Sequence, residues 1–319
     1  MTTSRPVEFG IQTGPQHAEY AQILEAWQTV EAEGFDHAWT FDHFIPIFSN
    51  PLGPCLEGWT VLTALLAQVP RLRGGTLVTG NSYRNPALLA NIAATLDRIT
   101  GGRVEMGIGA GWWDMEYKAY GYDFPPVAQR IHALEESVQI MKSLWTEQRT
   151  NFAGKHYTIT DALCEPKPVQ TPHIPFWIGG AGPKLTLRVV ARHAQGWNTF
   201  LMPREDYQLL LGALEGHCVK AGRNPDDIRK SLAASLVIDP DPARLQAKLE
   251  AVAKQRNQSP EEIRKRTLIG TPDDVAAQIL GLAEQGVDHI ILSMRAPYPL
   301  DDLRLFGREV IPRVRKAGH

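Results

Sequence analysis

The sequence predicts a (β/α)8 (TIM) barrel, an α/β fold, from two observations. Eight short apolar runs alternate with helical patterns along the 319 residues, and strands joined through helices must run parallel. Glycines and polar residues stand directly after several of these strands, where a barrel carries its catalytic groups. An open doubly wound sheet is the alternative, but such a sheet has a phosphate turn after its first strand, and Ile11-Gln-Thr-Gly-Pro15 is no such turn.

The strands are predicted at 7–11, 37–40, 74–79, 103–112, 176–178, 196–198, 231–238 and 288–293. Helices are predicted at 18–33, 58–68, 85–99, 127–145, 183–193, 205–221, 242–266 (in segments), 272–285 and 301–315.

The helix at 85–99 has clear end signals. Asn85 can cap the first backbone N–H groups, Pro86 suits the first helical position, and Gly101-Gly102 stops the helix. Helical spacing predicts a buried face made of Leu88, Leu89, Ile92, Leu96 and Ile99.

We expect one domain, 1–319, interrupted by an insertion at about 146–172. Within it, Phe152 to Ile159 resembles a hairpin, and Pro166, Pro168 and Pro172 exclude regular structure after it. A long irregular connection in a compact domain is functional or disordered, and the aromatic content of this one favours an ordered cover over the C-terminal mouth of the barrel.

The composition is that of a globular protein, with 43% hydrophobic and 21% charged residues. A net charge of -2 gives no reason to expect nucleic acid or an anionic membrane as partner. The start of the chain lacks a signal peptide and no run of 18 apolar residues occurs, so we expect a cytoplasmic protein. Cys55, Cys164 and Cys218 are odd in number and far apart, which favours buried small residues over a disulfide, a zinc site or a catalytic thiol.

Three strand ends carry unusual residues. Gly107, Gly109 and Gly111 alternate, but Trp112 stands where the dinucleotide fingerprint needs its third glycine. Glycines at a strand end imply close approach of the backbone, either by a planar ligand or by a neighbouring strand. The turn Gly179-Gly-Ala-Gly182 leads into a helix start, which offers free N–H groups and a positive dipole end to a phosphate, unless it is only a capped helix.

Asp42 and His43 follow the second strand. The pKa range of histidine suits a proton donor or a hydrogen-bond donor, so His43 is a candidate catalytic residue with Asp42 beside it. The structural alternative is that Asp42 holds His43 only to anchor the loop. No metal site is expected here, because no third ligand stands at a suggestive spacing.

These motifs together resemble the bacterial luciferase-like superfamily, and within it the deazaflavin-dependent oxidoreductases. The resemblance rests on Val78 to Ala90, on Ala93 to Arg103, on Gly107 to Trp112, and on Ala191 to Asn198. It spans about residues 7–200 and weakens toward the C-terminus. It implies a luciferase-like TIM barrel that binds coenzyme F420, a 5-deazaflavin, at its C-terminal face.

The resemblance also implies a non-prolyl cis peptide at Leu77-Val78 behind the cofactor ring and a phosphate site at 179–182. The implied cofactor-binding residues are Asp42, His43, Leu77, Val78, Thr79, Asn81, Gly107, Gly109, Ala110, Gly111, Trp112, Gly179, Gly180, Ala181 and Gly182. The anionic tail of F420 is expected to contact Lys184 and Arg188. Members of this family usually form homodimers, for which the apolar helix 58–68 is the candidate contact.

One position departs from the family pattern. Sugar-phosphate dehydrogenases of this branch carry a catalytic glutamate where this chain has Trp112, which disfavours sugar-phosphate oxidation. Trp112 and Trp113 are interpreted either as an aromatic wall beside the ring or as packing residues.

The expected function is F420-dependent hydride transfer to or from a small organic substrate. One alternative is an FMN-dependent luciferase-like monooxygenase served by a separate flavin reductase. Another is a flavin-binding barrel without catalysis.

Overall fold

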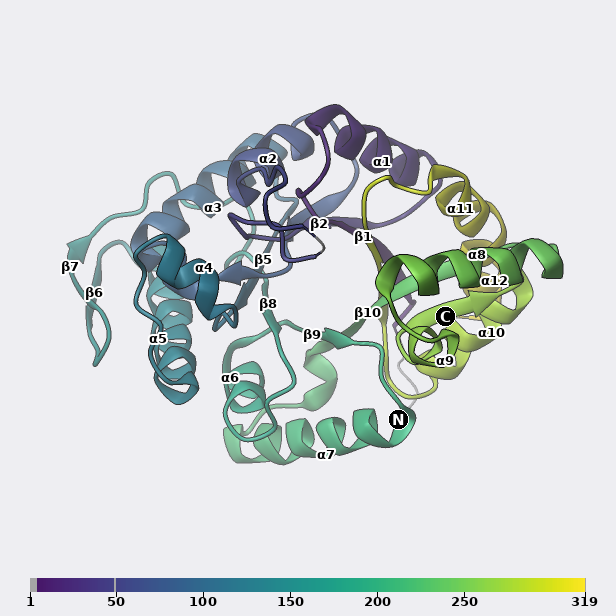
Figure 1. Ribbon diagram of the computed structural model, residues 1–319. Coiled ribbons are helices and arrows are strands. Elements are labelled where there is room, and N and C mark those ends of the chain that lie inside the picture. Colours follow the sequence, from purple (N-terminus) through teal and green to yellow (C-terminus); the bar gives the residue numbers. More distant parts are fainter. Residues whose placement is uncertain (1–4, 49, 319) are drawn as a thin grey trace.

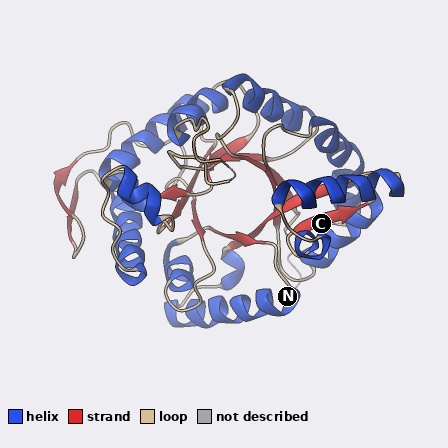
Figure 2. Ribbon diagram, viewed as in Figure 1, coloured by secondary structure: helices blue, strands red, loops and turns tan. Residues whose placement is uncertain are grey.

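The computed structural model describes residues 5–48 and 50–318. Its centre is a closed barrel of eight parallel strands, seen down the axis in Figures 1 and 2. The barrel strands are β1 (Glu8–Thr13), β2 (His37–Thr40), β3 (Arg73–Thr76), β5 (Val104–Gly109), β8 (Phe176–Gly179), β9 (Gly196–Phe200), β10 (Arg229–Ile238) and β12 (His289–Met294). Neighbours pair in this order, and β12 pairs with β1 to close the ring, so the predicted barrel is confirmed.

Helices surround the barrel, as Figure 2 shows in blue. They are α1 (Tyr20–Ala32), α2 (Gly58–Leu66), η1 (Asn81–Tyr83), α3 (Pro86–Thr100), α4 (Asp114–Ala119), α5 (Val127–Thr146), α6 (Thr186–His193), α7 (Arg204–Ala221), η2 (Pro225–Asp227), α8 (Pro242–Arg256), α9 (Pro260–Arg264), α10 (Pro272–Ala283), α11 (Leu300–Leu305), the π-helical turn η3 (Phe306–Val310) and α12 (Ile311–Lys316). No helix in the described ranges is long and apolar enough to cross a membrane.

The end signals of α3 act as predicted, but its buried face differs. Asn85 accepts a hydrogen bond from the backbone N–H of Ala87, and Gly101 ends the helix in the left-handed conformation. Leu88 and Ile99 are each 56% exposed, so their predicted burial is wrong. The residues that pack inward are Leu89, Ala90, Ala93, Ala94 and Leu96. Small residues let α3 lie close to the neighbouring α5, and that choice depends on tertiary packing.

Four further strands in the described part of the chain lie outside the ring. The predicted hairpin is present as β6 (Thr150–Ala153) and β7 (Thr158–Ala162), antiparallel and projecting at the left of Figure 1. A short β11 (Thr267–Gly270), not predicted, extends the sheet beside the second half of β10. The two-residue β4 (Thr79–Gly80) continues the line of β3 and pairs with β5. That the whole chain forms one domain stays a prediction.

The barrel interior is filled by two tryptophans. Trp39 and Trp177 are buried there, with ring centroids 5.7 Å apart. Glycines on neighbouring strands make room, because a Cβ on Gly196 would lie 2.2 Å from the ring of Trp177 and one on Gly75 only 3.3 Å from Trp39. The tryptophan layer separates the C-terminal mouth from a polar cluster at the other end.

Candidate active site

The predicted site residues gather where the strands end. Asp42 and His43 follow β2, and Leu77 and Val78 lie between β3 and β4. The Leu77-Val78 peptide is cis, as the resemblance implied. The side-chain amide of Gln12 on β1 donates a hydrogen bond to the carbonyl oxygen of Leu77, and the hydroxyl of Ser293 donates to Gln12 at 3.1 Å. Gln12 was not predicted as part of the site.

Asp42 is fixed by a buried ion pair. The guanidinium of Arg84 contacts both carboxylate oxygens of Asp42, at 2.6 and 3.0 Å, and also pairs with Glu57. The hydroxyl of Thr79 donates to Asp42 and accepts from the indole N–H of Trp59 at 2.8 Å. Burial alone would lower the pKa of Arg84, but the two carboxylates outweigh it and raise that pKa. These contacts give Asp42 and Thr79 a positioning role at the site.

His43 is held by Glu116 rather than by Asp42. Its Nδ1 lies 2.7 Å from Oε2 of Glu116, a carboxylate with no exposed surface on α4. The other carboxylate oxygen of Glu116 accepts the backbone N–H groups of Phe44 and Ile45, at 2.5 and 3.1 Å. Nε2 of His43 has no hydrogen-bond partner within residues 5–48 and 50–318. The imidazole is therefore oriented through one nitrogen and has the other available.

Glu116 is a fixed anion. Its burial would raise its pKa, but the hydrogen bonds from His43, Tyr83 and the backbone N–H of Phe44 outweigh this and lower the pKa. The phenol of Tyr83 donates to Oε2 of Glu116, and burial and the nearby carboxylate raise the pKa of that phenol. A carboxylate that stays ionised beside His43 favours its Nδ1–H form, which leaves Nε2 as a hydrogen-bond acceptor.

Two tryptophans border His43. The rings of Trp112 and Trp113 lie edge-on to the imidazole at centroid distances of 5.9 and 6.1 Å, and they stack on each other at 6.0 Å. Trp112 is 61% exposed and Trp113 half-buried. An exposed ring of this size contributes little to the core, so the geometry favours the aromatic wall over packing for Trp112.

The three glycines at the end of β5, of which Gly107 and Gly109 lie in the strand and Gly111 follows it, leave space for neighbouring parts of the protein. A Cβ on Gly107 would lie 1.8 Å from the carbonyl oxygen of Thr76, and one on Gly109 would lie 2.8 Å from the side chain of Val78. Gly111 has a positive φ of 74° and lies under Tyr117. Of the two interpretations, tight packing against the neighbouring strand therefore explains Gly107. Arg130 binds the carbonyl oxygens of Ala110 and Gly111 and so holds this strand end in place.

The turn 179–182 is open to solvent. Gly180, Ala181 and Gly182 are exposed, and Gly180 has a φ of 131°. The N–H of Gly180 is used within the fold, on the carbonyl oxygen of Asn198 at 3.0 Å. The following helix α6 begins at Thr186, three residues later than predicted, and has no side-chain cap. The first turn of α6 is only partly open to an anion, because the N–H of Leu187 already donates to the carbonyl oxygen of Gly182 at 3.1 Å.

Asn81 offers a buried acceptor at the site. Its Nδ2 donates to the hydroxyl of Tyr157 at 3.2 Å, while its Oδ1 is buried without a partner in the part of the chain that the structure describes. Tyr157 belongs to the insertion, whose hairpin lies beside the barrel but reaches the site through this contact. A ligand with a ring N–H would satisfy Oδ1, and both deazaflavin and flavin rings carry one.

Sequence reasoning missed Glu116, Arg84 and Tyr83. Arg84 and Tyr83 lie inside the family motif from Val78 to Ala90, and only this position could have indicated a role at the site. Glu116 lies in an aromatic stretch that matches no motif. Cys164 and Cys218 are buried, as expected, whereas Cys55 is only partly buried. Burial and then the charges of Glu116 and Asp42 raise the pKa of Cys55 to about 12, and burial raises the pKa values of Cys164 and Cys218.

Comparisons with known proteins relate the chain to F420-dependent and FMN-dependent enzymes. An F420-dependent glucose-6-phosphate dehydrogenase of Segniliparus rotundus is 29% identical over 341 residues, covering 98% of this chain and 99% of that protein. An FMNH2-dependent dimethylsulfone monooxygenase of Pseudomonas putida is 28% identical over 320 residues, covering 91% of this chain and 86% of that protein.

Among solved structures, the coenzyme F420-dependent tetrahydromethanopterin reductase of Methanopyrus kandleri has the same fold, with a TM-score of 0.82 and 22% identity over 97% of this chain and 99% of that one. The family described as luciferase-like monooxygenase matches residues 3–289. The chain belongs to the luciferase-like monooxygenase family.

Proposed function

We propose that the protein is an F420-dependent oxidoreductase that moves a hydride between the deazaflavin and a small organic substrate. The His43–Glu116 pair carries the proposal, because it presents an oriented imidazole beside an aromatic wall at the catalytic end of the barrel. The F420-dependent relative over 98% of the chain supports the choice of cofactor. When bound, the deazaflavin supplies a ring carbon that gives or accepts the hydride.

The chain's own residues bind the cofactor and orient the substrate beside it. The ring site consists of Leu77, Val78, Asn81 and the strand end from Gly107 to Trp112, and the phosphate site of Gly179 to Gly182 with the uncapped start of α6. His43 donates or accepts a proton at the substrate through Nε2 and is positioned by Glu116, while Asp42 is held by Arg84 and Thr79 beside it. Holding the reacting groups in this geometry provides most of the rate advantage.

We infer the cofactor of the Segniliparus relative for this protein, but not its sugar-phosphate substrate. The resemblance puts Trp112 at the position of the catalytic glutamate of sugar-phosphate dehydrogenases. Glu116 does not take over that role, because its oxygens are engaged by His43, Tyr83 and two backbone N–H groups. We infer a small substrate that stacks on the Trp112 ring and is not a sugar phosphate.

The alternative is an FMN-dependent monooxygenase, which the Pseudomonas relative favours. The contacts available to a ring and a ribityl phosphate are the same for both cofactors, so they do not discriminate. A flavin-binding barrel without catalysis is the third candidate, and the oriented His43 argues against it.

Titration of the purified apoprotein with oxidised F420 and with FMN tests the proposal. We expect tighter binding of F420, followed by substrate-dependent F420 reduction or F420H2 oxidation. Tight FMN binding with no affinity for F420 at low salt contradicts the proposal and favours the monooxygenase. F420 binding without turnover of any alcohol or carbonyl compound leaves the non-catalytic barrel.

We further propose a cytoplasmic homodimer. The outer faces of α2 and α3, neighbours at the upper left of Figure 1, carry Thr60, Ala64 and Ala67 on α2 and the exposed Leu88 and Ile99 on α3. Exposed apolar residues gathered on one face are typical of an interface. Sedimentation at micromolar concentration is expected to give a dimer, and Leu88→Glu with Ile99→Glu a monomer; a wild-type monomer of 35.5 kDa contradicts this. Cell fractionation tests the location.

A further inference from the structure

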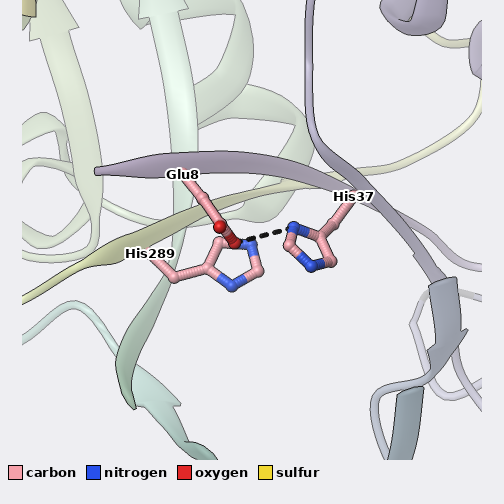
Figure 3. Close-up of side chains that lie close together, drawn as sticks. All are labelled: Glu8, His37 and His289. Atoms are coloured by element: carbon pink, nitrogen blue, oxygen red, sulfur yellow. Dashed lines mark ion pairs between the residues drawn. The ribbon is translucent and has the colours of Figure 1, made fainter. Parts of the chain in front are cut away.

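A second polar cluster lies at the N-terminal end of the barrel, below the tryptophan layer. Its centre is formed by Glu8, His37 and His289, the first residues of β1, β2 and β12. Strand register brings them together, because Glu8 is the direct partner of His289, and Gly10, two residues on from Glu8, is the partner of His37. All three side chains therefore point into the same end of the barrel, as Figure 3 shows.

The three side chains have the spacing of metal ligands. One ligand atom from each residue lies within 4.8 Å of the others, and Oε2 of Glu8 is 3.4 Å from Nδ1 of His37. With metal–ligand bonds of about 2.0–2.1 Å, two ligands of a tetrahedral zinc ion stand about 3.3 Å apart. The Glu8–His37 distance already matches, and the side chain of His289 needs only a small shift to complete the set.

His289 packs against the rings of His37 and Trp177, but its ring nitrogens have no role in that packing. It has no exposed surface, and neither ring nitrogen has a hydrogen-bond partner in the described part of the chain. Buried polar groups are nearly always paired, and a neutral imidazole without a partner is the form that binds a metal ion.

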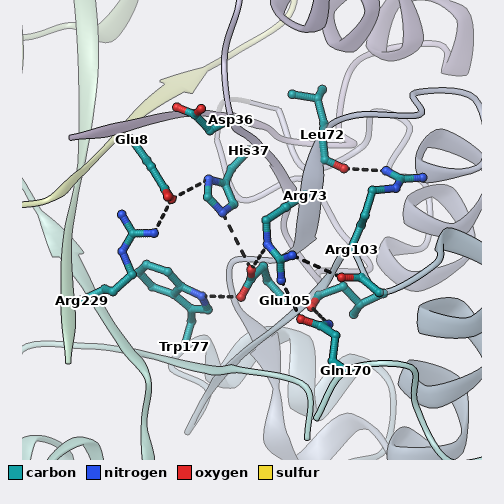
Figure 4. A network of polar contacts seen from close by, with 12 residues as sticks. Glu8, Asp36, His37, Leu72, Arg73, Arg103, Glu105, Gln170, Trp177 and Arg229 are labelled. Carbon is teal, nitrogen blue, oxygen red and sulfur yellow. Dashed lines mark hydrogen bonds and ion pairs between the residues drawn. The ribbon is translucent and has the colours of Figure 1, made fainter. Parts of the chain in front are cut away.

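A second layer of contacts orients His37, as Figure 4 shows. On the side away from Glu8, Nε2 of His37 faces Oε1 of Glu105 at 3.8 Å. Glu105 is itself held by Arg73 at 2.5 Å and by the indole N–H of Trp177 at 2.7 Å. A histidine between a metal ion and a fixed carboxylate is the usual arrangement around metal ligands.

Arg229 is the group that competes with a cation. Its guanidinium pairs with Oε2 of Glu8, but it also contacts Asp288, through Nε at 3.5 Å to the carboxylate and NH2 at 3.1 Å to the backbone oxygen. The contacts of Glu8 with His37 and with Arg229 are both made through Oε2. Arg229 therefore keeps a partner if Glu8 turns to an ion.

Two of the three side chains, Glu8 and His37, are reached from a cavity, and His289 lies buried behind them. A cavity of about 320 Å³ opens at this end of the barrel, and Glu8, His37, Glu105 and Arg229 line it. A cavity of this size admits an ion together with a water molecule as fourth ligand.

We propose that Glu8, His37 and His289 bind a divalent transition-metal ion of the zinc class. The ion joins the last strand of the barrel to the first two, at the seam where the ring closes. The N-terminal end of such barrels serves stability rather than catalysis, so this site is independent of the proposed function at the other end. Its expected effect is higher thermal stability.

Cobalt titration of the tag-free, chelator-treated full chain tests the proposal. We expect one Co²⁺ per chain with the visible absorption of a four-coordinate site, displaced by Zn²⁺, and a higher melting temperature of the wild type with Zn²⁺. Both effects are expected to disappear in His289→Gln and to persist in His173→Gln, which changes a buried histidine bonded to the carbonyl oxygen of Ile174 outside the cluster.

Two further variants make the result decisive. Glu8→Gln changes a partly exposed ligand, so it tests the metal site even if His289→Gln does not fold. The Glu8→Gln variant is also expected to lose the cobalt spectrum. Glu105→Gln is expected to weaken binding by about 10-fold, the usual effect of removing an outer contact. Absence of a cobalt spectrum in the wild type, or full binding retained in Glu8→Gln, overturns the proposal.

Discussion

Nδ1 of His43 lies 2.7 Å from Oε2 of Glu116, although 73 positions separate the two residues. The contact joins the loop after β2 to α4, and it determines which nitrogen of His43 is available. When the imidazole of His43 is removed, Glu116 keeps its hydrogen bonds from Tyr83, Phe44 and Ile45. A His43 variant can therefore lose activity while its loop stays in place.

His43→Ala is expected to lower turnover by about 10²-fold or more, the usual contribution of an acid–base group. Cofactor affinity and melting temperature are expected to stay near the wild-type values, because the other bonds of Glu116 hold the loop. Steady-state kinetics and thermal unfolding check this. A loss of melting temperature that parallels the loss of activity would show that His43 only anchors its loop.

Glu116→Gln is expected to lower kcat by less than His43→Ala, with little change in KM, because Glu116 acts through the orientation of His43. The matched control is Tyr83→Phe, which removes one hydrogen bond from Glu116 but leaves the contact with His43. Its kcat is expected to lie closer to that of the wild type. An increase in KM with unchanged kcat in Glu116→Gln contradicts the positioning role.

Arg84→Met is expected to destabilise the protein by about 3–5 kcal/mol, because it leaves the carboxylate of Asp42 buried without its ion pair. Urea unfolding measures the effect. Lys118→Met is the control: its ion pair with Asp114 is exposed, so the change is expected to be under about 1 kcal/mol. Equal effects of the two substitutions would refute the structural importance of the Arg84–Asp42 pair.

Lys184→Ala is expected to weaken F420 binding about fivefold at low salt, the effect of up to about 1 kcal/mol from one exposed charge. Of the two cations expected at the tail, Lys184 is exposed, while Arg188 is paired with Glu135 at 3.3 Å. The difference is expected to shrink as salt screens the charge, and FMN binding is expected not to change. A loss of F420 affinity that is independent of salt speaks against a tail contact.

Glu135→Gln is expected to reduce the pH dependence of stability in acid. The hydrogen bond from His193 lowers the pKa of Glu135 to about 2 against its burial, with help from Arg192 and Arg188. Because the folded-state pKa is depressed, the stabilisation is complete above about pH 4.3, the ordinary value, and is lost as the pH falls toward 2. Melting temperatures measured across this window are expected to converge for variant and wild type at the acid end. The exposed Glu147→Gln is expected to follow the wild-type curve.

Local sequence signals predicted most of the fold because their physics is local. The second strand, 37–40, has the predicted bounds, since a turn ends it on each side. Five residues at helical spacing along α5 are all buried, because a 20-residue helix with one apolar stripe has one way to face the barrel: Ile131, Leu134, Val138, Met141 and Trp145. The cap at Asn85 and the stop at Gly101 depend only on adjacent backbone groups.

Tertiary structure decided what depends on neighbours distant in the chain. The burial of Ala90, Ala93 and Ala94 in place of Leu88 and Ile99 follows from how close α5 lies to α3. The four-residue β11 has no pattern of its own and is stabilised by pairing with β10. Glu116 meets His43, and Glu8 meets His37 and His289, only after the barrel closes and the strand register is set. Residue types and their spacing in the sequence determined that a barrel forms and that its strand ends suit a cofactor ring. The closure of the barrel then determined which charged side chains meet.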